Sequence, residues 1–347
     1  MILSMSEAGI IDISKKVSEN IDVCENVNRK IDTSKKVKVS ENVVGNTDDS
    51  KLDIFEIERF AIHDGPGIRT TVFLQGCPLR CQWCANPESQ TVGRHILRFE
   101  NKCTDCGRCV AFCENNALTI ADGKVAANIE KCISCGKCVD ECLNEAIKES
   151  GRKITCEELF SLIMRDKDYY DTSGGGITLS GGEALLQIDK LGPFLKKCKQ
   201  NHIHIAVETC GYISEEIVEK AEKYVDLFLF DVKTLDHDKF QKFTGGNLQR
   251  IITAFTRICN SYSEKLIARV PVIPEFNDNE IKDIMKFVAK HHVKTIHLLP
   301  YHTLGMAKYK QLGREYPYHV TESMAPDELN PYIEIGEKMG LSVKIGG

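Results

Sequence analysis

Clustered cysteines constrain this chain more than any other feature of its sequence. Eleven of its 16 cysteines lie within residues 77–142, in three groups with short, regular spacing. The cysteine trio has the spacing C-x3-C-x2-C and consists of Cys77, Cys81 and Cys84. Two further runs share the spacing C-x2-C-x2-C-x3-C: the first is Cys103, Cys106, Cys109 and Cys113, and the second is Cys132, Cys135, Cys138 and Cys142. Such spacing lets several thiolates converge on one metal centre. The other five cysteines are scattered, and we predict that they are ordinary thiols.

The two runs form an internal repeat with a period of 29 residues. In two-cluster ferredoxins the fourth cysteine of each run binds the cluster of the other run. The sequence therefore predicts two [4Fe-4S] sites with crossed ligands, the Cys142 set (Cys103, Cys106, Cys109 and Cys142) and the Cys113 set (Cys132, Cys135, Cys138 and Cys113). A pair of zinc sites is the alternative, although zinc ligands more often come as two separated pairs. Glu114 and Leu143 stand where the bacterial pattern has proline.

The trio supplies only three thiolates, so a four-iron cluster held there keeps one iron without a protein ligand. An open coordination position is what a catalytic metal site needs. The trio follows an apolar run at residues 71–74, which predicts a loop after a strand. A three-ligand zinc site completed by a histidine is the alternative.

The residues around the trio resemble those of the activating enzymes of glycyl-radical enzymes, a branch of the radical S-adenosylmethionine (SAM) enzymes. A C-x3-C-x2-C trio after a strand is the signature of the superfamily. The narrower resemblance rests on three segments: Ile62-His63-Asp64-Gly65-Pro66-Gly67-Ile68-Arg69-Thr70, Gly76-Cys77-Pro78-Leu79-Arg80-Cys81 and Trp83-Cys84-Ala85-Asn86-Pro87-Glu88. It covers residues 52–347 and is strongest to the branch that carries an inserted two-cluster ferredoxin domain.

The resemblance implies an oxidoreductase that uses three [4Fe-4S] clusters and SAM. The open iron would bind the amino and carboxylate groups of SAM, and one electron would cleave SAM to methionine and a 5'-deoxyadenosyl radical. That radical would take a hydrogen atom from a glycine of a partner glycyl-radical enzyme and leave a glycyl radical there. A flavodoxin or a ferredoxin is the expected electron donor, and the inserted clusters would relay electrons or assist docking. We expect a monomer.

The resemblance also implies which residues contact SAM. Active residues of such barrels lie at the C-terminal ends of parallel strands. The expected contacts are Trp83, Cys84, Ala85, Gly181, Gly182, Glu183, Asp231, Val232, Lys233 and His302. Glu208-Thr209 is expected to order a monovalent cation or SAM, and Asp64 to meet the glycine loop of the partner. Alternatives are that Glu183 stabilises a helix N-terminus, that Asp231 and Lys233 form an ordinary ion pair, and that Arg269 forms either a ligand contact or a core ion pair.

Six apolar runs predict strands of a parallel sheet that is buried on both faces. They are residues 71–74, 176–180, 204–208, 227–232, 266–273 and 295–299, with a seventh candidate at 341–345. Predicted helices alternate with them at residues 156–165, 186–200, 214–223, 248–260 and 279–291. This alternation predicts βαβ units with right-handed crossovers. We therefore expect an α/β fold, an incomplete (β/α)6 TIM-like barrel of residues 51–98 and 150–347, with a ferredoxin-type insert at residues 99–149.

Residues 1–50 differ from the rest of the chain. They repeat short words such as Ser-Lys-Lys and contain no aromatic residue, which predicts a mobile, low-complexity extension. The net charge of -5 lacks the basic excess of a nucleic-acid-binding protein. No apolar run approaches the roughly 20 residues that span a bilayer, and the start lacks the pattern of a secretion signal. We expect a cytoplasmic protein without disulfides.

Three other functions stay open at this point. A radical SAM enzyme could act on a small molecule instead of a protein. A ferredoxin-like electron carrier with a degenerate barrel would not cleave SAM, and a zinc-binding structural protein would contain no iron. The sequence does not identify the partner enzyme.

Overall fold

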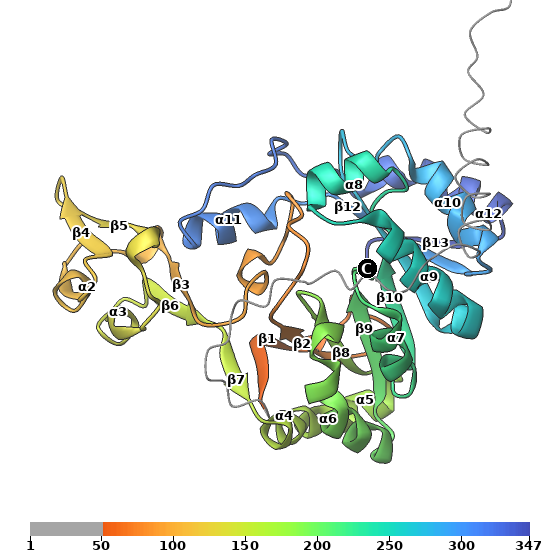
Figure 1. Ribbon diagram of the computed structural model, residues 1–347, viewed down its shortest axis with the longest axis horizontal. Helices are drawn as coiled ribbons and strands as arrows, with labels where there is room; N and C mark the ends of the chain where they lie inside the picture. Colours follow the sequence, from red (N-terminus) through yellow and green to blue (C-terminus); the bar gives the residue numbers. More distant parts are fainter. Residues whose placement is uncertain (1–50) are drawn as a thin grey trace, which may run out of the picture. The chain divides into compact units, whose positions relative to one another are not determined.

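A nine-stranded sheet is the centre of the fold (Figure 1). The computed structural model describes residues 51–347, so the predicted extension at residues 1–50 lies outside the described residues. The strand order is β13-β12-β11-β10-β9-β8-β2-β1-β7. The strands are β1 Leu52–Ala61, β2 Arg69–Leu74, β7 Arg152–Ile154, β8 Gly176–Gly181, β9 His204–Thr209, β10 Leu227–Asp231, β11 Leu266–Val272, β12 Thr295–Pro300 and β13 Ser342–Ile345.

All neighbours from β2 to β13 are parallel, whereas β1 and β7 are antiparallel additions at the other edge. The α/β prediction is confirmed, and each of the seven predicted strand regions contains a strand. The central strands are buried on both faces: β8 and β10, for example, are buried along almost their whole length, whereas β13 at the edge has no buried residue. Parallel strands end at one common edge, so the loops that follow them meet there.

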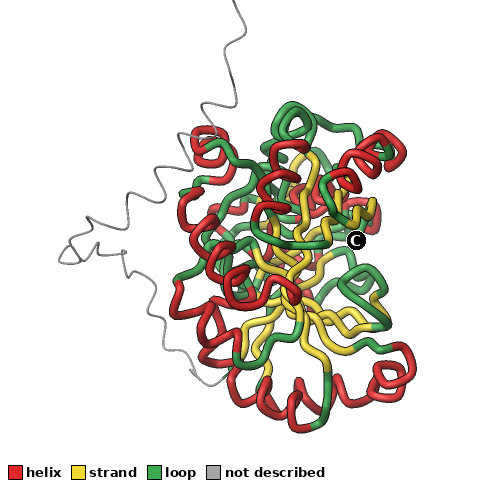
Figure 2. The backbone as a smooth tube through the Cα atoms, turned by 90° about the vertical axis from the view of Figure 1, so that its right-hand side faces the viewer, coloured by secondary structure: helices red, strands yellow, loops and turns green. Residues whose placement is uncertain are grey.

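Helices connect the strands, and most of them lie on the outer side of the sheet (Figure 2), whereas α11 lies toward the segment with the two cysteine runs (Figure 1). They are α4 Cys156–Ile163, α5 Lys167–Ser173, α6 Ile188–Gln200, α7 Glu215–Glu222, α8 His237–Thr244, α9 Leu248–Tyr262, α10 Ile281–Lys290, α11 Leu304–Gln311 and α12 Pro331–Lys338. Side chains of Thr155, Ser214, Asp236 and Asn247 cap the first turns of α4, α7, α8 and α9. Within residues 51–347, no helix has both the length and the apolar character needed to cross a membrane.

The segment with the two cysteine runs consists of two equivalent halves. The first half contains a 3-10 turn Glu100–Lys102, helix α2 Arg108–Ala111 and strand β4 Leu118–Ala121, which pairs with β5 Lys124–Ala127. The second contains a 3-10 turn Ile129–Lys131, helix α3 Lys137–Asp140 and strand β6 Ile147–Ser150, which pairs with β3 His95–Arg98. Positive φ angles recur at the same offset, at Asp105 and Ser134, Gly107 and Gly136, and Asn116 and Glu145. The sequence repeat is therefore also a structural repeat.

Candidate active site

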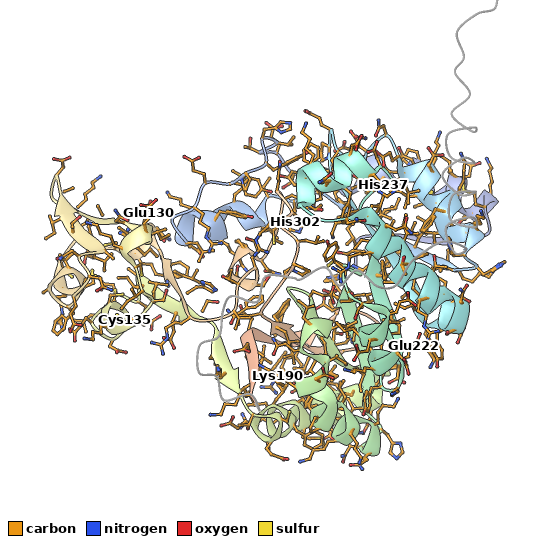
Figure 3. The ribbon with its side chains drawn as sticks, viewed as in Figure 1. Glu130, Cys135, Lys190, Glu222, His237 and His302 are labelled. Carbon is orange, nitrogen blue, oxygen red and sulfur yellow. The ribbon has the colours of Figure 1, made fainter. Side chains whose placement is uncertain are left out.

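The cysteine trio lies in a cavity of about 240 Å3 at the C-terminal ends of the parallel strands. The trio follows β2, and the other walls come from the ends of β8, β9, β10, β11 and β12. His302, which is labelled in Figure 3, follows β12 and also lines this cavity. Of the SAM contacts expected from the sequence, the cavity is lined by Trp83, Cys84, Ala85, Gly181, Gly182, Asp231, Lys233 and His302. Glu183 and Val232 are buried and do not line it.

Gly181 and Gly182 are glycines because the loop of the trio passes directly over them. Gly181 has φ +107°, and a Cβ there would lie 2.3 Å from the carbonyl oxygen of Leu74. A Cβ on Gly182 would lie 2.3 Å from the carbonyl oxygen of Gly76, whereas the Gly182 amide donates to the Leu74 oxygen at 2.8 Å. These glycines therefore let the turn after β8 pack against the backbone that enters the trio.

The Glu183 carboxylate joins the turn after β8 to the end of β9. It accepts hydrogen bonds from Thr209 Oγ1 at 2.8 Å, from the Cys210 amide at 2.9 Å and from the Leu185 amide at 3.3 Å. Burial raises the pKa of Glu183. The bond to Leu185 is the helix-start role that the sequence left as an alternative. The carboxylate thus holds the cavity wall from behind, and a contact with SAM stays a prediction.

Four charged side chains form a network on the cavity wall. Lys233 Nζ donates to Asp231 Oδ2 at 2.8 Å, and Arg269 pairs with Glu208. Burial disfavours the ammonium of Lys233, but the neighbouring Asp231 carboxylate outweighs this effect and raises the pKa of Lys233. Glu208 also accepts from Ser180, and burial raises the pKa of Glu208. Both cations therefore stay charged at neutral pH.

Arg269 has an unsatisfied donor in this network. Its Nε is buried and has no hydrogen-bond partner, and it lies 3.6 Å from Asp231 Oδ1. A buried donor without a partner costs free energy, and a guanidinium suits a carboxylate ligand. Arg269 thus forms the ion pair that was weighed from the sequence and also lines the cavity, and a contact between Arg269 and a ligand stays a prediction.

Cys210 is a cavity residue that the sequence reasoning missed. It directly follows β9 and lines the cavity with the trio. Its thiol donates a hydrogen bond to the sulfur of Cys77, which lowers the pKa of Cys77. Burial raises the pKa of Cys81 to about 12 and that of Cys84 to about 11. The available signal was its position immediately after a predicted strand, which is where the other cavity residues lie.

Two further predicted contacts are occupied by bonds within the chain. Thr209 Oγ1 donates to Glu183 and Glu208 pairs with Arg269, so their cation site stays a prediction. Asp64 Oδ2 accepts from Thr71 Oγ1 at 2.6 Å, which fixes the loop before β2. A contact between Asp64 and a partner protein also stays a prediction.

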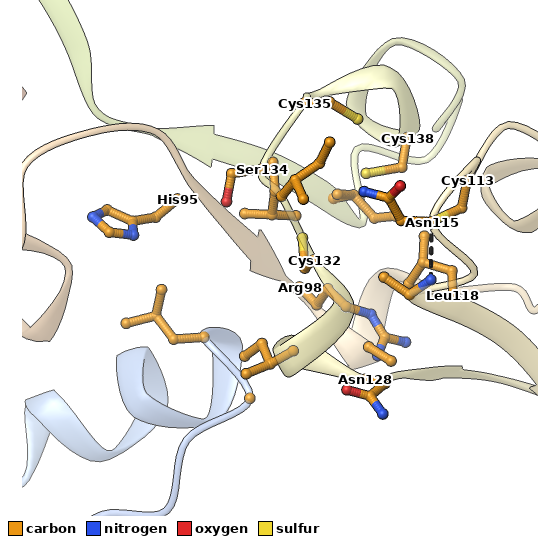
Figure 4. Close-up of a pocket in the computed structure, with 18 of the residues that line it drawn as sticks. His95, Arg98, Cys113, Asn115, Leu118, Asn128, Cys132, Ser134, Cys135 and Cys138 are labelled. Carbon is orange, nitrogen blue, oxygen red and sulfur yellow. Dashed lines mark hydrogen bonds between the residues drawn. The ribbon is translucent and has the colours of Figure 1, made fainter. Parts of the chain in front are cut away.

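The two cysteine runs line two separate cavities. One, of about 260 Å3, is lined by Cys103, Cys106, Cys109 and Cys142. The other, of about 530 Å3, is lined by Cys113, Cys132, Cys135 and Cys138 (Figure 4). The fourth cysteine of each run therefore faces the cavity of the other run. Each also accepts an amide hydrogen bond at its sulfur, Cys113 from Ala117 at 3.3 Å and Cys142 from Ala146 at 3.2 Å.

The shape of these cysteine groups bears on the zinc alternatives. Within residues 51–347, no three or more Cys, His, Asp or Glu side chains converge closely enough to hold a single metal ion. Four sulfurs line each of the two cavities, which is the number that a [4Fe-4S] cluster needs. The donor atoms are soft thiolates throughout, a type that both iron–sulfur clusters and zinc bind.

Comparison with known proteins gives consistent matches. Residues 71–288 match the radical SAM superfamily. The chain is 41% identical over 289 residues to the choline trimethylamine-lyase activating enzyme of Oleidesulfovibrio alaskensis, which covers 80% of this chain and 93% of that protein. It is 37% identical over 299 residues to the trans-4-hydroxy-L-proline dehydratase activating enzyme of Clostridioides difficile, with 85% and 99% covered. It is 42% identical over 272 residues to the isethionate sulfite-lyase activating enzyme of Oleidesulfovibrio alaskensis, with 76% and 87% covered.

Proposed function

We propose residue roles from the premise that this chain belongs to the radical SAM superfamily and, within it, to the activating enzymes of glycyl-radical enzymes. It is therefore an oxidoreductase whose [4Fe-4S] cluster and SAM yield methionine and a 5'-deoxyadenosyl radical, and the radical takes a hydrogen atom from a glycine of its partner. What remains is to assign this chemistry to residues of this chain.

Cys77, Cys81 and Cys84 hold the catalytic cluster, and the cavity around them receives SAM. One observation supports this assignment above all: the trio shares its cavity with the buried, unpartnered Nε of Arg269. Arg269 and Lys233 take the carboxylate of SAM, since both are cations at the cavity wall, Lys233 buried and Arg269 only 17% exposed. Trp83, Ala85, Gly181, Gly182, Asp231 and His302 complete the SAM site, and Glu183 positions the wall behind it.

Water exclusion is the second task of these residues, because a primary carbon radical attacks most C–H bonds that it meets. Trp83 is 8% exposed, and its ring lies 4.5 Å from that of Phe276 and 5.7 Å from that of Tyr318. This aromatic group, with Ile273 and Tyr301, forms a small core of its own beside the cavity. It holds the trio loop in place and keeps that side of the cavity dry.

Residues 99–149 form a ferredoxin-type insert with two further [4Fe-4S] clusters. Support comes from the crossed cysteine sets, the repeated halves and the cavity at each set. With both clusters bound, the insert would receive electrons from a flavodoxin or ferredoxin and pass them toward the catalytic cluster. Every cysteine within residues 51–347 is free, which suits a reducing compartment such as the cytoplasm.

An anaerobic assay with candidate partners tests the proposal. The protein is loaded with iron and sulfide, reduced with dithionite and given SAM, and 5'-deoxyadenosine is measured. Choline trimethylamine-lyase, trans-4-hydroxy-L-proline dehydratase and isethionate sulfite-lyase are then added in turn, and electron paramagnetic resonance (EPR) is used to detect a glycyl radical. We expect Cys81→Ala to abolish 5'-deoxyadenosine formation and Cys259→Ala, at a buried cysteine outside the cavities, to retain it. Turnover by Cys81→Ala, or a protein free of iron after anoxic purification, would contradict the assignment.

A further inference from the structure

The two cysteine sets of the insert differ in what encloses them. The cavity of the Cys142 set is lined only by residues between Arg98 and Ile147, all in or beside the insert. The cavity of the Cys113 set has an additional wall, formed by residues 310–314 at the end of α11. In Figure 4 the blue ribbon of α11 lies at the edge of this cavity. Of the two sets, only the Cys113 set therefore borders a segment outside the insert.

The start of α11 lies against the loop of the cysteine trio. A Cβ on Gly305 would lie 2.5 Å from the carbonyl oxygen of Cys84, so backbone meets backbone there. Lys308 Nζ donates to Asn86 Oδ1 at 2.7 Å and to Glu88 Oε1 at 2.6 Å. An eight-residue helix is about 12 Å long. One short helix thus separates the trio loop from the cavity of the Cys113 set.

The end of α11 is attached to the insert by contacts of its own. Lys310 Nζ lies 2.7 Å from Glu100 Oε2. A Cβ on Gly313 would lie 2.7 Å from Cδ1 of Ile129, which precedes the second run. Between the two ends, the rings of Tyr309 and Tyr316 pack at 5.3 Å, and Gln90 Nε2 donates to the Tyr309 hydroxyl at 3.5 Å. The path from one site to the other therefore runs through packed protein.

Building on the proposed function, we propose that the Cys113 set is the inner site, adjacent to the trio across α11, and that the Cys142 set is the outer site, nearer the external donor. A reduced flavodoxin or ferredoxin loses one electron at the outer site. The same single electron is finally gained by SAM, whose sulfonium C–S bond breaks to give methionine and the 5'-deoxyadenosyl radical. Between these two steps, the electron would pass from the outer site to the inner site and then across α11 to the trio.

This order can be tested with matched variants at equivalent positions of the repeat. Cys106→Ser impairs the Cys142 set and Cys135→Ser the Cys113 set, in the full-length protein loaded with iron and sulfide. The readout is the microwave power saturation of the EPR signal from the reduced, SAM-bound trio cluster. A nearby paramagnetic cluster speeds its relaxation, and this effect falls steeply with distance. We expect Cys135→Ser to lower the power for half-saturation several-fold and Cys106→Ser to leave it almost unchanged.

The reverse pattern, or equal effects of the two variants, would overturn the assignment. If one substitution empties both insert sites, the other variant decides alone, and Cys109→Ser with Cys138→Ser forms a second matched pair. Failure of the proposed function itself looks different: the wild-type protein would bind iron for one cluster only, or dithionite and SAM would give no 5'-deoxyadenosine. The saturation experiment therefore separates the order of the sites from their existence.

Discussion

The ion pair between Lys308 and Glu88 joins α11 to the segment that follows the cysteine trio, and Lys308→Met is its sharpest perturbation. The Glu88 side chain is only 3% exposed, whereas that of Lys308 is 33% exposed. Glu88 Oε1 accepts from Lys308 at 2.6 Å, and its buried Oε2 has no hydrogen-bond partner. Removal of Lys308 would thus leave a buried carboxylate without its cation.

Removing one partner of a fully buried pair costs about 3–5 kcal/mol. Lys308 is one-third exposed, so water can replace part of its interaction, and we expect a loss of about 2 kcal/mol in the free energy of unfolding. Lys310→Met is the matched control on the same helix, because its pair with Glu100 is 72% and 61% exposed. An exposed pair of this kind contributes about 0–1 kcal/mol.

Thermal unfolding of the cluster-loaded proteins measures the difference. The double variant Lys308→Met with Glu88→Gln should recover part of the loss, since it removes the buried charge together with its partner. Equal melting temperatures for Lys308→Met and Lys310→Met would refute the reasoning. So would a double variant that is destabilised by the sum of the two single changes.

Three further predictions concern α11, the cavity wall and the ion pair between Arg59 and Asp166. Gly305→Ala should lower the free energy of unfolding by about 1–3 kcal/mol, because its new Cβ would meet the carbonyl oxygen of Cys84. Leu304→Ala, at a side chain that is 74% exposed, should change it by less than about 0.5 kcal/mol. Denaturant titration of both variants checks this difference. Arg269→Lys keeps the charge but loses the planar fork, and we expect SAM to bind about 10-fold more weakly in equilibrium dialysis, with Arg257→Lys, at a pair outside the cavity, unchanged. The hydrogen bond from Arg59 lowers the pKa of Asp166, so this bond stabilises the fold above the ordinary pKa of aspartate, about 3.9, and its contribution disappears as the pH falls through the native value. Arg59→Met should therefore raise the pH at which acid unfolding begins, as followed by circular dichroism, and an unchanged acid transition would show that Asp166 does not depend on Arg59.

Several strands that the sequence predicted, among them β2, β8 and β10, are buried along almost their whole length, whereas β13 has no buried residue. Short runs such as Leu227-Phe228-Leu229-Phe230, which alternate with helix-like segments, are typical of strands in a buried parallel sheet. Strand β1 was missed because Glu56, Glu58 and Arg59 interrupt its apolar residues. Most residues in the second half of the strand are exposed. It forms because it pairs with β2 on one side and with β7 on the other, a long-range effect that a local pattern does not contain.

The parts of the candidate site that depend on the spacing of cysteines along the chain could be predicted. The parts that depend on how neighbouring strands pair could not. The trio and the crossed cysteine sets follow from spacing along the chain. The network of charged side chains on the cavity wall does not follow from spacing, because Asp231 lies opposite Arg269 only through the register in which β10 and β11 pair. The orientation of Glu183 depends likewise on β9, whose end supplies Thr209 and Cys210 as donors. Nor does the sequence reveal that α11, which carries no cysteine, lies between two groups of cysteines.

The exchange of Cys113 and Cys142 between the two halves of the insert has an evolutionary consequence. A single half on its own would have three sulfurs at its cavity and a fourth with nothing to face. Deletion of either half would thus damage both cavities at once. We therefore expect relatives of this chain to contain the whole insert or none of it, and not one half alone.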